Sequence, residues 1–247
     1  MPRLSVNLNK IALLRNSRRT GVPDVLHFAR LALDAGAAGI TVHPRPDQRH
    51  IRDSDVDALA QMMQPLRPAI ELNIEGYPDE RLIEIVRRVR PEQCTLVPDA
   101  PGVLTSEEGW KLDDKERAVV EPAVAALKAA GCRVILFVDP GTEIFARNRA
   151  IGADGVEIYT GSYAGAFRAG DFAAALSACA ETAGHAAERG LVVNIGHDLN
   201  LQNLPPLIDA LPAVAEASIG HELTADALAM GFAAAVRAYR DALAGGR

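Results

Sequence analysis

Polar residues able to exchange protons gather in short segments that directly follow apolar runs. Four of the six histidines lie in such segments: His43, His50, His197 and His221. Glu75 and Arg45 occupy segments of the same kind. Histidine transfers protons near neutral pH, and a carboxylate does so when burial raises its pKa. Any one of these histidines could equally be structural, but together with Glu75 and Arg45 they predict acid–base catalysis on an anionic, phosphate-bearing substrate.

The segments that must position these residues alternate along the whole chain. Eight short apolar runs predict strands at 4–9, 39–43, 69–74, 93–97, 133–138, 155–158, 191–194 and 216–219. Eight amphipathic segments predict helices at 24–35, 53–66, 78–89, 115–130, 142–151, 172–189, 204–210 and 224–243. Strict alternation favours a parallel sheet, and eight strands close it into a barrel. Residues 1–247 are therefore predicted to form one (β/α)8 TIM-barrel domain, with extra helical segments in the loops that follow the strands.

Helix-capping residues and long loops fit this fold. Glycines at the ends of helices, where a left-handed C-cap is expected, occur in segments 35–40, 130–134, 151–156 and 189–193. Asp53 and Thr224 are predicted to N-cap helices. Segments 10–23, 98–114 and 159–171 are longer than a minimal connection, and the last two are candidates for a lid. The active site of such a barrel lies at the carboxyl ends of the strands, where the polar segments fall.

Two near-identical segments follow the last two predicted strands: Asn-Ile-Gly-His-Asp-Leu (194–199) and Ser-Ile-Gly-His-Glu-Leu (218–223). The seventh and eighth loops of this fold commonly bind phosphate, because glycine lets backbone N–H groups and a helix N-terminus approach the anion. Each glycine could instead only form a tight turn. The repeat falls at both expected positions, so phosphate binding is the favoured interpretation.

Composition disfavours several other functions. The net charge of −6 argues against binding to nucleic acid, and no apolar run reaches the length of a membrane span. The N-terminus enters a strand pattern without the apolar region of a signal peptide, so a cytoplasmic protein is expected. Cys94, Cys132 and Cys179 are scattered and are expected in the core. Metal-ligand spacings are missing within single elements, and Arg45 beside His43 disfavours a cation, so no metal site is expected.

The chain resembles the pyridoxine 5′-phosphate synthase family over essentially its whole length. The matching motifs, in order, are VNLNKIALLRNSR (6–18), GITVHPRPDQRHI (39–51), NIEG (73–76), LVP (96–98), LTSEEGW (104–110), VEIYTGSYA (156–164), VNIGH (193–197) and SIGH (218–221). The resemblance implies a transferase that condenses 1-deoxy-D-xylulose 5-phosphate with 3-amino-2-oxopropyl phosphate. The products are pyridoxine 5′-phosphate, phosphate and water, in vitamin B6 biosynthesis. It also implies that no metal or organic cofactor takes part, and that the protein is a homo-oligomer, commonly an octamer.

The resemblance also implies a role for each matching residue. His43 and Glu75 would accept protons, and His197 would donate one. Contacts to the aminoketone phosphate would come from Asn7, Arg18, Asp198, Gly220 and His221. Contacts to the deoxyxylulose phosphate would come from Asn9, Lys10, Arg45, His50 and Thr105.

Three positions, in two segments, depart from the family pattern. Asn9 and Lys10 stand where many members have Asp-His, so a carboxylate becomes an amide and an imidazole becomes an ammonium. Lys10 can still neutralise a phosphate, although as a point charge of different reach. Asp198 stands where glycine is common, and its carboxylate would repel a phosphate. Contact through the backbone N–H of Asp198 is therefore expected.

Two other functions fit parts of the pattern. An aldolase of the same fold would use a lysine Schiff base, and Lys10 is the one lysine predicted at the carboxyl ends of the strands. A barrel that only binds a phosphorylated ligand would need the arginines and the Gly-His loops, but not His43 with Glu75. Borohydride trapping and substitution of His43 or Glu75 separate these alternatives.

Overall fold

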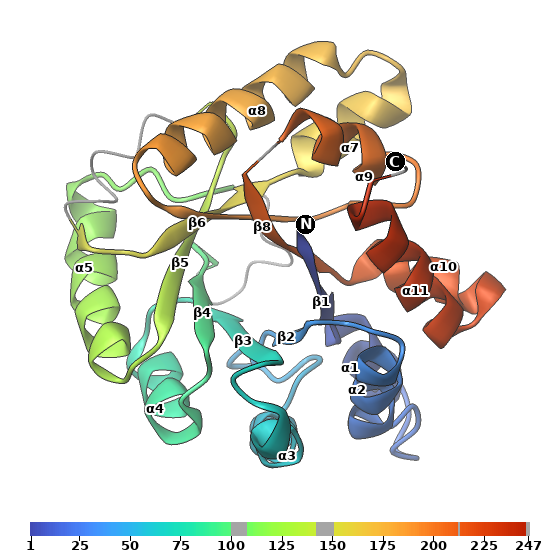
Figure 1. Ribbon diagram of the computed structural model, residues 1–247. Helices are drawn as coiled ribbons and strands as arrows, with labels where there is room; N and C mark the ends of the chain where they lie inside the picture. Colours follow the sequence, from blue (N-terminus) through green and yellow to red (C-terminus); the bar gives the residue numbers. More distant parts are fainter. Residues whose placement is uncertain (100–107, 142–150, 212, 246–247) are drawn as a thin grey trace.

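Eight parallel strands form a closed barrel in chain order (Figure 1). The computed structural model describes residues 1–99, 108–141, 151–211 and 213–245. The strands are β1 (Arg3–Asn7), β2 (Gly39–Val42), β3 (Glu71–Gly76), β4 (Gln93–Leu96), β5 (Arg133–Val138), β6 (Gly155–Tyr159), β7 (Val192–Gly196) and β8 (Val214–Ile219). Pairing of β1 with β8 closes the sheet. The predicted TIM barrel is confirmed.

Helices surround the barrel on the outside (Figure 1). They are α1 (Asn9–Asn16), α2 (Val25–Asp34), α3 (Asp53–Met63), α4 (Glu80–Val89), α5 (Asp114–Ala129), α7 (Gly161–Ala169), α8 (Ala173–Glu188), α9 (Leu204–Ala210), α10 (His221–Met230) and α11 (Phe232–Leu243), with a 3-10 turn η1 at Gln64–Leu66. Two of the three long segments contain the extra helices α1 and α7. No helix in the described part of the chain is long and apolar enough to cross a membrane.

Several predicted boundaries can be compared with the structure. The helix predicted at 224–243 is wrong as one element, because Gly231 has a φ of 85° and separates α10 from α11. Thr224 is not an N-cap: its N–H and hydroxyl both donate to the Gly220 carbonyl, at 3.0 and 2.8 Å, so it lies inside the first turn. Asp53 is the first residue of α3, and Arg52 occupies the N-cap position. Most of the helix predicted at 142–151 lies outside the described residues.

Glycine C-caps occur as predicted. The last residues before β2, β5, β6 and β7 include Gly36, Gly131, Gly152 and Gly190, and all four have positive φ, between 73° and 99°. An L-residue with a side chain rarely adopts this conformation. The helix-to-strand connections are therefore recognisable from sequence alone.

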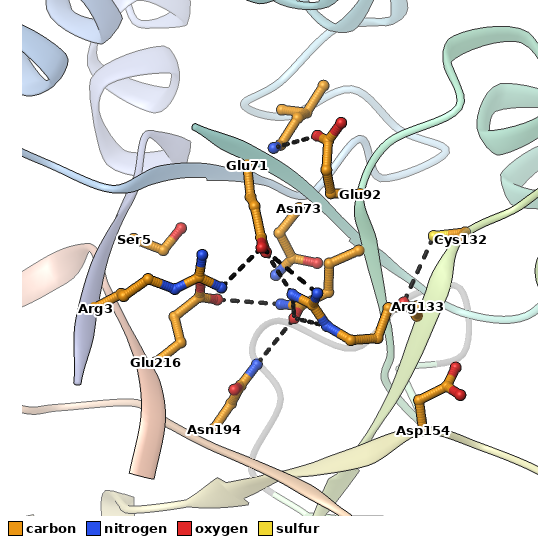
Figure 2. Close-up of polar contacts among 12 residues, drawn as sticks. Arg3, Ser5, Glu71, Asn73, Glu92, Cys132, Arg133, Asp154, Asn194 and Glu216 are labelled. Atoms are coloured by element: carbon orange, nitrogen blue, oxygen red, sulfur yellow. Dashed lines mark hydrogen bonds and ion pairs between the residues drawn. The ribbon is translucent and has the colours of Figure 1, made fainter. Parts of the chain in front are cut away.

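The interior of the barrel is polar, unlike the branched aliphatic layers usual in this fold. Figure 2 shows its amino-terminal layer, where Glu71 accepts hydrogen bonds from Arg3, at 2.8 Å, and from Arg133. Across the barrel, the Gln93 amide donates to Glu216 at 3.1 Å. The apolar core lies between the strands and the helices instead.

A second interior layer continues toward the carboxyl ends of the strands. The hydroxyls of Ser5 and Thr41 are 2.6 Å apart, and Thr95 donates to Asn73 at 3.2 Å. Side chains alternate across a strand, so the residues two positions further along also point inward. On β1 and β3 these are Asn7 and Glu75, which brings the polar interior to the mouth of the barrel.

Candidate active site

A cavity of about 610 Å³ opens at the carboxyl ends of the strands. All but two of the predicted site residues line it: Asn7, Asn9, Lys10, His43, Arg45, His50, Glu75, His197, Asp198, Gly220 and His221. Arg18 is exposed in the segment after α1 and is not among the lining residues. Thr105 lies outside the described residues. The structure thus brings together groups from the ends of β1, β2, β3, β7 and β8.

Hydrogen bonds connect the ends of the first three strands. The Asn7 amide nitrogen donates to the Glu75 carboxylate at 3.3 Å, and its oxygen accepts from the backbone N–H of Asn9 at 3.0 Å. The Asn9 side-chain oxygen accepts from the backbone N–H of His43 at 2.9 Å. An amide provides this acceptor as well as a carboxylate does. Asn9 therefore links β1 to the end of β2 without placing a negative charge beside the cavity.

Two buried carboxyl groups, those of Glu75 and Glu157, line the cavity. Burial, and next the charge of Asp99, raises the pKa of Glu75 to about 7. Burial, and next Glu75, also raises the pKa of Glu157 well above its usual value. Glu157 Oε2 has no hydrogen-bond partner among the described residues. The charge of Glu75 disfavours ionisation of Glu157, and the raised pKa of Glu75 lets its carboxyl group hold a proton near neutral pH and exchange it with a substrate.

The histidines after β2 are uncharged at neutral pH. Burial and the nearby Arg45 lower the pKa of His43 well below 6.5, and the same causes lower the pKa of His50 to about 4. His50 Nδ1 accepts from the backbone N–H of Ile51 at 2.9 Å, which leaves the proton of the neutral ring on Nε2. A neutral imidazole can accept a proton, so the environment of His43 suits the role of a base.

His197 follows β7 in a left-handed backbone conformation, with a φ of 82°, and Asp198 has a φ of 55°. Two buried side chains hold this turn. The Thr160 hydroxyl lies 2.5 Å from the Gly196 carbonyl oxygen and 2.6 Å from that of His197, and Asn203 donates to the Asp198 carbonyl at 3.0 Å. Non-glycine residues in this region are uncommon and are found at functional sites.

The ring of His197 is also fixed by aromatic contacts. Its centroid is 4.8 Å from that of Phe137 and 5.4 Å from that of Tyr159. Burial lowers its pKa, and the Asp198 carboxylate opposes that effect. An anionic substrate in the cavity would oppose it further, which would allow His197 to carry a proton in the complex.

Positive charge and N–H donors suit the cavity to phosphate groups. Lys10, Arg45 and Arg49 line it, and Arg45 forms a buried ion pair with Asp99. At the other side, α10 begins at the cavity directly after Gly220. A Cβ at Gly220 would lie 3.0 Å from the Asn7 Cβ, so glycine allows the start of this helix to approach β1. Helix N-termini favour anions.

Sequence analysis did not assign a role to four residues at this site: Arg49, Asp99, Glu157 and Tyr159. Glu157 and Tyr159 occupy alternate positions of β6, so the period of two could have identified Glu157 as an inward carboxylate. Asp99 carries no comparable signal, because its ion pair with Arg45 joins two different loops. Among the described residues, no group of three or more His, Cys, Asp or Glu side chains is arranged to hold a metal ion.

Comparisons with known proteins agree with the fold and show the family of the chain. Solved structures at 12–14% identity share the fold: phosphoribosyl anthranilate isomerase from Thermotoga maritima, with a TM-score of 0.61 over 99% of both chains, and tryptophan synthase from M. tuberculosis, with 0.66 over 99% of this chain and 94% of that one. Pyridoxine 5′-phosphate synthase of Allorhizobium ampelinum is 49% identical over 97% of both chains. That of Brucella suis is 50% identical over 98% of this chain and 99% of its own. The family model described as pyridoxal phosphate biosynthesis protein PdxJ matches residues 4–245, so the chain belongs to the PdxJ family.

Proposed function

We propose that the protein is a pyridoxine 5′-phosphate synthase in vitamin B6 biosynthesis. It condenses 1-deoxy-D-xylulose 5-phosphate with 3-amino-2-oxopropyl phosphate, and it releases pyridoxine 5′-phosphate, inorganic phosphate and water. Its relatives of about 50% identity carry this name. The observation that carries the proposal is the convergence of His43, Glu75 and His197 on one cavity that also holds cationic side chains and a helix N-terminus.

The ring closure needs repeated proton transfers, and the cavity supplies groups for them. The amine of one substrate must lose protons as it forms a C–N bond to the carbonyl carbon of the other, and the carbonyl oxygen must gain protons to leave as water. Neutral His43 is suited to accept from the amine, and His197 is suited to protonate the departing oxygen once substrate anions raise its pKa. Glu75, with a pKa of about 7, can remove a C–H proton and return it elsewhere. No metal or organic cofactor is required by this scheme.

Each substrate brings one phosphate, and we assign two separate sets of residues to bind them. We assign Asn9, Lys10, Arg45, His50 and Thr105 to the deoxyxylulose phosphate. We assign Asn7, Arg18, Asp198, Gly220 and His221 to the aminoketone phosphate. Arg18 would reach its ligand only if the segment after α1 folds over the cavity or a neighbouring copy supplies it, because Arg18 is not among the lining residues.

We further propose that the protein acts as a homo-octamer in the cytoplasm. Exposed apolar side chains support self-association: Leu13 and Leu14 on α1, and Leu228 and Met230 on α10, which packs against α1. The three cysteines are free and buried, as is usual for a reducing compartment. Light scattering on the purified protein, with Leu228→Glu as a disrupting variant, tests the assembly.

The function is tested by incubating the purified protein with both substrates and a chelator. Pyridoxine 5′-phosphate should appear by absorbance and mass, together with one equivalent of inorganic phosphate. His43→Ala and Glu75→Gln should abolish turnover while the fold, followed by circular dichroism, is retained. A borohydride-stable adduct on Lys10 would show aldolase chemistry instead. If the protein binds the substrates but forms no product, and if neither substitution changes this binding, the protein is a binding protein and not an enzyme.

A further inference from the structure

The carboxyl end of α1 carries a buried arginine that does not line the cavity. Arg15 is only 6% exposed, and its guanidinium donates to both carboxylate oxygens of Asp55 in α3, at 2.6 and 2.8 Å. The same Nη2 donates to the backbone carbonyl of His50 at 3.0 Å. Bidentate hydrogen bonding of this kind is specific to arginine, because lysine cannot donate to two partners in fixed directions.

The next residue, Asn16, also contacts the loop between β2 and α3, which contains His50. The Asn16 amide nitrogen lies within hydrogen-bond distance of three successive carbonyls, those of Gln48, Arg49 and His50, at 3.3, 3.0 and 2.8 Å. The Asn16 oxygen accepts from Arg15 Nε at 3.1 Å, so the two side chains also hold each other. Apart from Arg15, the hydrogen-bond partners of the Asn16 side chain belong to this loop.

The loop between β2 and α3 carries four cavity-lining residues: His43, Arg45, Arg49 and His50. Its internal hydrogen bonds join only near neighbours along the chain: Arg45 N–H to the His43 carbonyl at 3.0 Å, Gln48 N–H to the Arg45 carbonyl at 2.9 Å, Arg49 N–H and Nε to the Asp47 carboxylate at 3.1 and 2.7 Å, and Ile51 N–H to His50 Nδ1 at 2.9 Å. Gln48 has a φ of 51°, a conformation that costs energy for a residue with a side chain. The loop thus depends on contacts from outside for its shape.

We propose that Arg15 and Asn16 are positioning residues that hold the β2–α3 loop so that Arg45 and His50 form a ready-made anion subsite. Neither residue touches the substrate. Both act through backbone carbonyls of the loop. Because the loop is already ordered, binding of the substrate phosphate to this subsite costs less conformational entropy. The proposal rests on the proposed function only in taking that anion to be the deoxyxylulose phosphate.

The variant that tests this is Asn16→Ala, since it removes the Asn16 contacts to three loop carbonyls and leaves the Arg15–Asp55 pair intact. Ser17→Ala is the matched control, because the Ser17 hydroxyl donates to the Leu14 carbonyl at 2.7 Å within α1 and not to the loop. Loss of the loop hydrogen bonds should raise the KM for the deoxyxylulose phosphate about tenfold. The KM for the aminoketone phosphate and kcat should change less than about threefold. Ser17→Ala should match the unchanged protein.

A readout independent of turnover is the titration of the His50 ring by NMR. His50 faces Lys10 of α1, Arg45, Arg49 and Asp47 of its own loop, and His43 at the end of β2. Releasing the loop exposes the ring to water, so its titration should move upward toward that of a free imidazole in Asn16→Ala. Binding of inorganic phosphate should weaken in parallel. These two measurements decide the proposal even if the protein makes no pyridoxine 5′-phosphate.

Two results would overturn the proposal. One is an Asn16→Ala protein whose His50 titration, phosphate affinity and KM values equal those of the control. The other is an equal rise in both KM values together with a lower melting temperature, which would show a general contribution to folding. Arg15→Lys provides a second check, because it keeps the positive charge but loses the bidentate hydrogen bonding of the guanidinium. It should reproduce the selective KM effect if the loop contact matters.

Discussion

Replacing Glu75 by Gln should stabilise the protein at high pH and destroy its activity. Gln has the same shape and can keep a hydrogen bond to Asn7, but it cannot ionise. In the folded protein, burial and Asp99 raise the pKa of Glu75 from 4.5 to about 7. The folded state therefore holds the Glu75 proton more tightly than the unfolded state does. As pH rises from below 4.5 to above 7, this group makes the unchanged protein progressively less stable.

The magnitude follows from the shift of the pKa. A shift of about 2.5 pKa units corresponds to about 3.5 kcal/mol at most, since one unit equals about 1.4 kcal/mol. Gln at position 75 cannot ionise, so the substituted protein does not lose this stability as pH rises. The difference in free energy of unfolding between Glu75→Gln and the unchanged protein should thus grow by about 3 kcal/mol between pH 4 and pH 8. Over the same range, loss of a general base should lower kcat by about 10²–10⁴-fold.

The assay is chemical denaturation of both proteins at several pH values between 4 and 8, with activity measured on the same samples. Glu84→Gln, on the exposed side of α4, is the control for removing a carboxylate. It should leave both activity and the pH dependence of stability unchanged. A stability difference for Glu75→Gln that stays flat across this pH range would refute the reasoning. A stability difference that grows toward acid pH would refute the reasoning as well.

Three further substitutions test separate parts of the site and the barrel. Thr160→Val removes the hydroxyl that lies against the Gly196 and His197 carbonyls, so kcat should fall about 10–100-fold from misplacement of His197, with Thr160→Ser restoring it in steady-state assays. Gly220→Ala places a Cβ 3.0 Å from that of Asn7, which displaces the start of α10, and the KM for the aminoketone phosphate should rise about tenfold. Glu71→Ala leaves Arg3 and Arg133 without their shared carboxylate, so denaturation should show a loss of about 2–3 kcal/mol with unchanged kcat. That loss is at the low end for a buried pair because the Arg3 side chain is 39% exposed.

The sequence predicts the barrel well because its signals are local. Alternating apolar runs mark the strands, and glycines such as Gly36 and Gly131 mark helix ends through their positive φ. A glycine inside a helical pattern is ambiguous, and for that reason the separation of α10 from α11 at Gly231 was not predicted. The start of α10 was placed too late for a similar reason, since Thr224 has the residue type of an N-cap but lies inside the first turn.

The site, like the fold, has features that local sequence signals predict and features that depend on contacts between distant segments. Strand-end position brings His43, Glu75 and His197 together, and the family motifs name them. The contacts that set their properties join distant segments: Asp99 with Arg45, and Arg15 with both Asp55 and the His50 carbonyl. No periodicity within a single element encodes such pairs. They depend on which loops the closed barrel places side by side.

The polar interior of the barrel links its two ends electrostatically. Glu216 lies near the amino-terminal layer, Glu157 and Glu75 line the cavity, and all three are buried with raised pKa values. The charge of Glu216 raises the pKa of both Glu75 and Glu157. Aliphatic layers would exclude water as well but would supply no such field. The charge of Glu216 thus adds a small contribution from the amino-terminal layer to the raised pKa of Glu75, whose main causes are burial and the charge of Asp99.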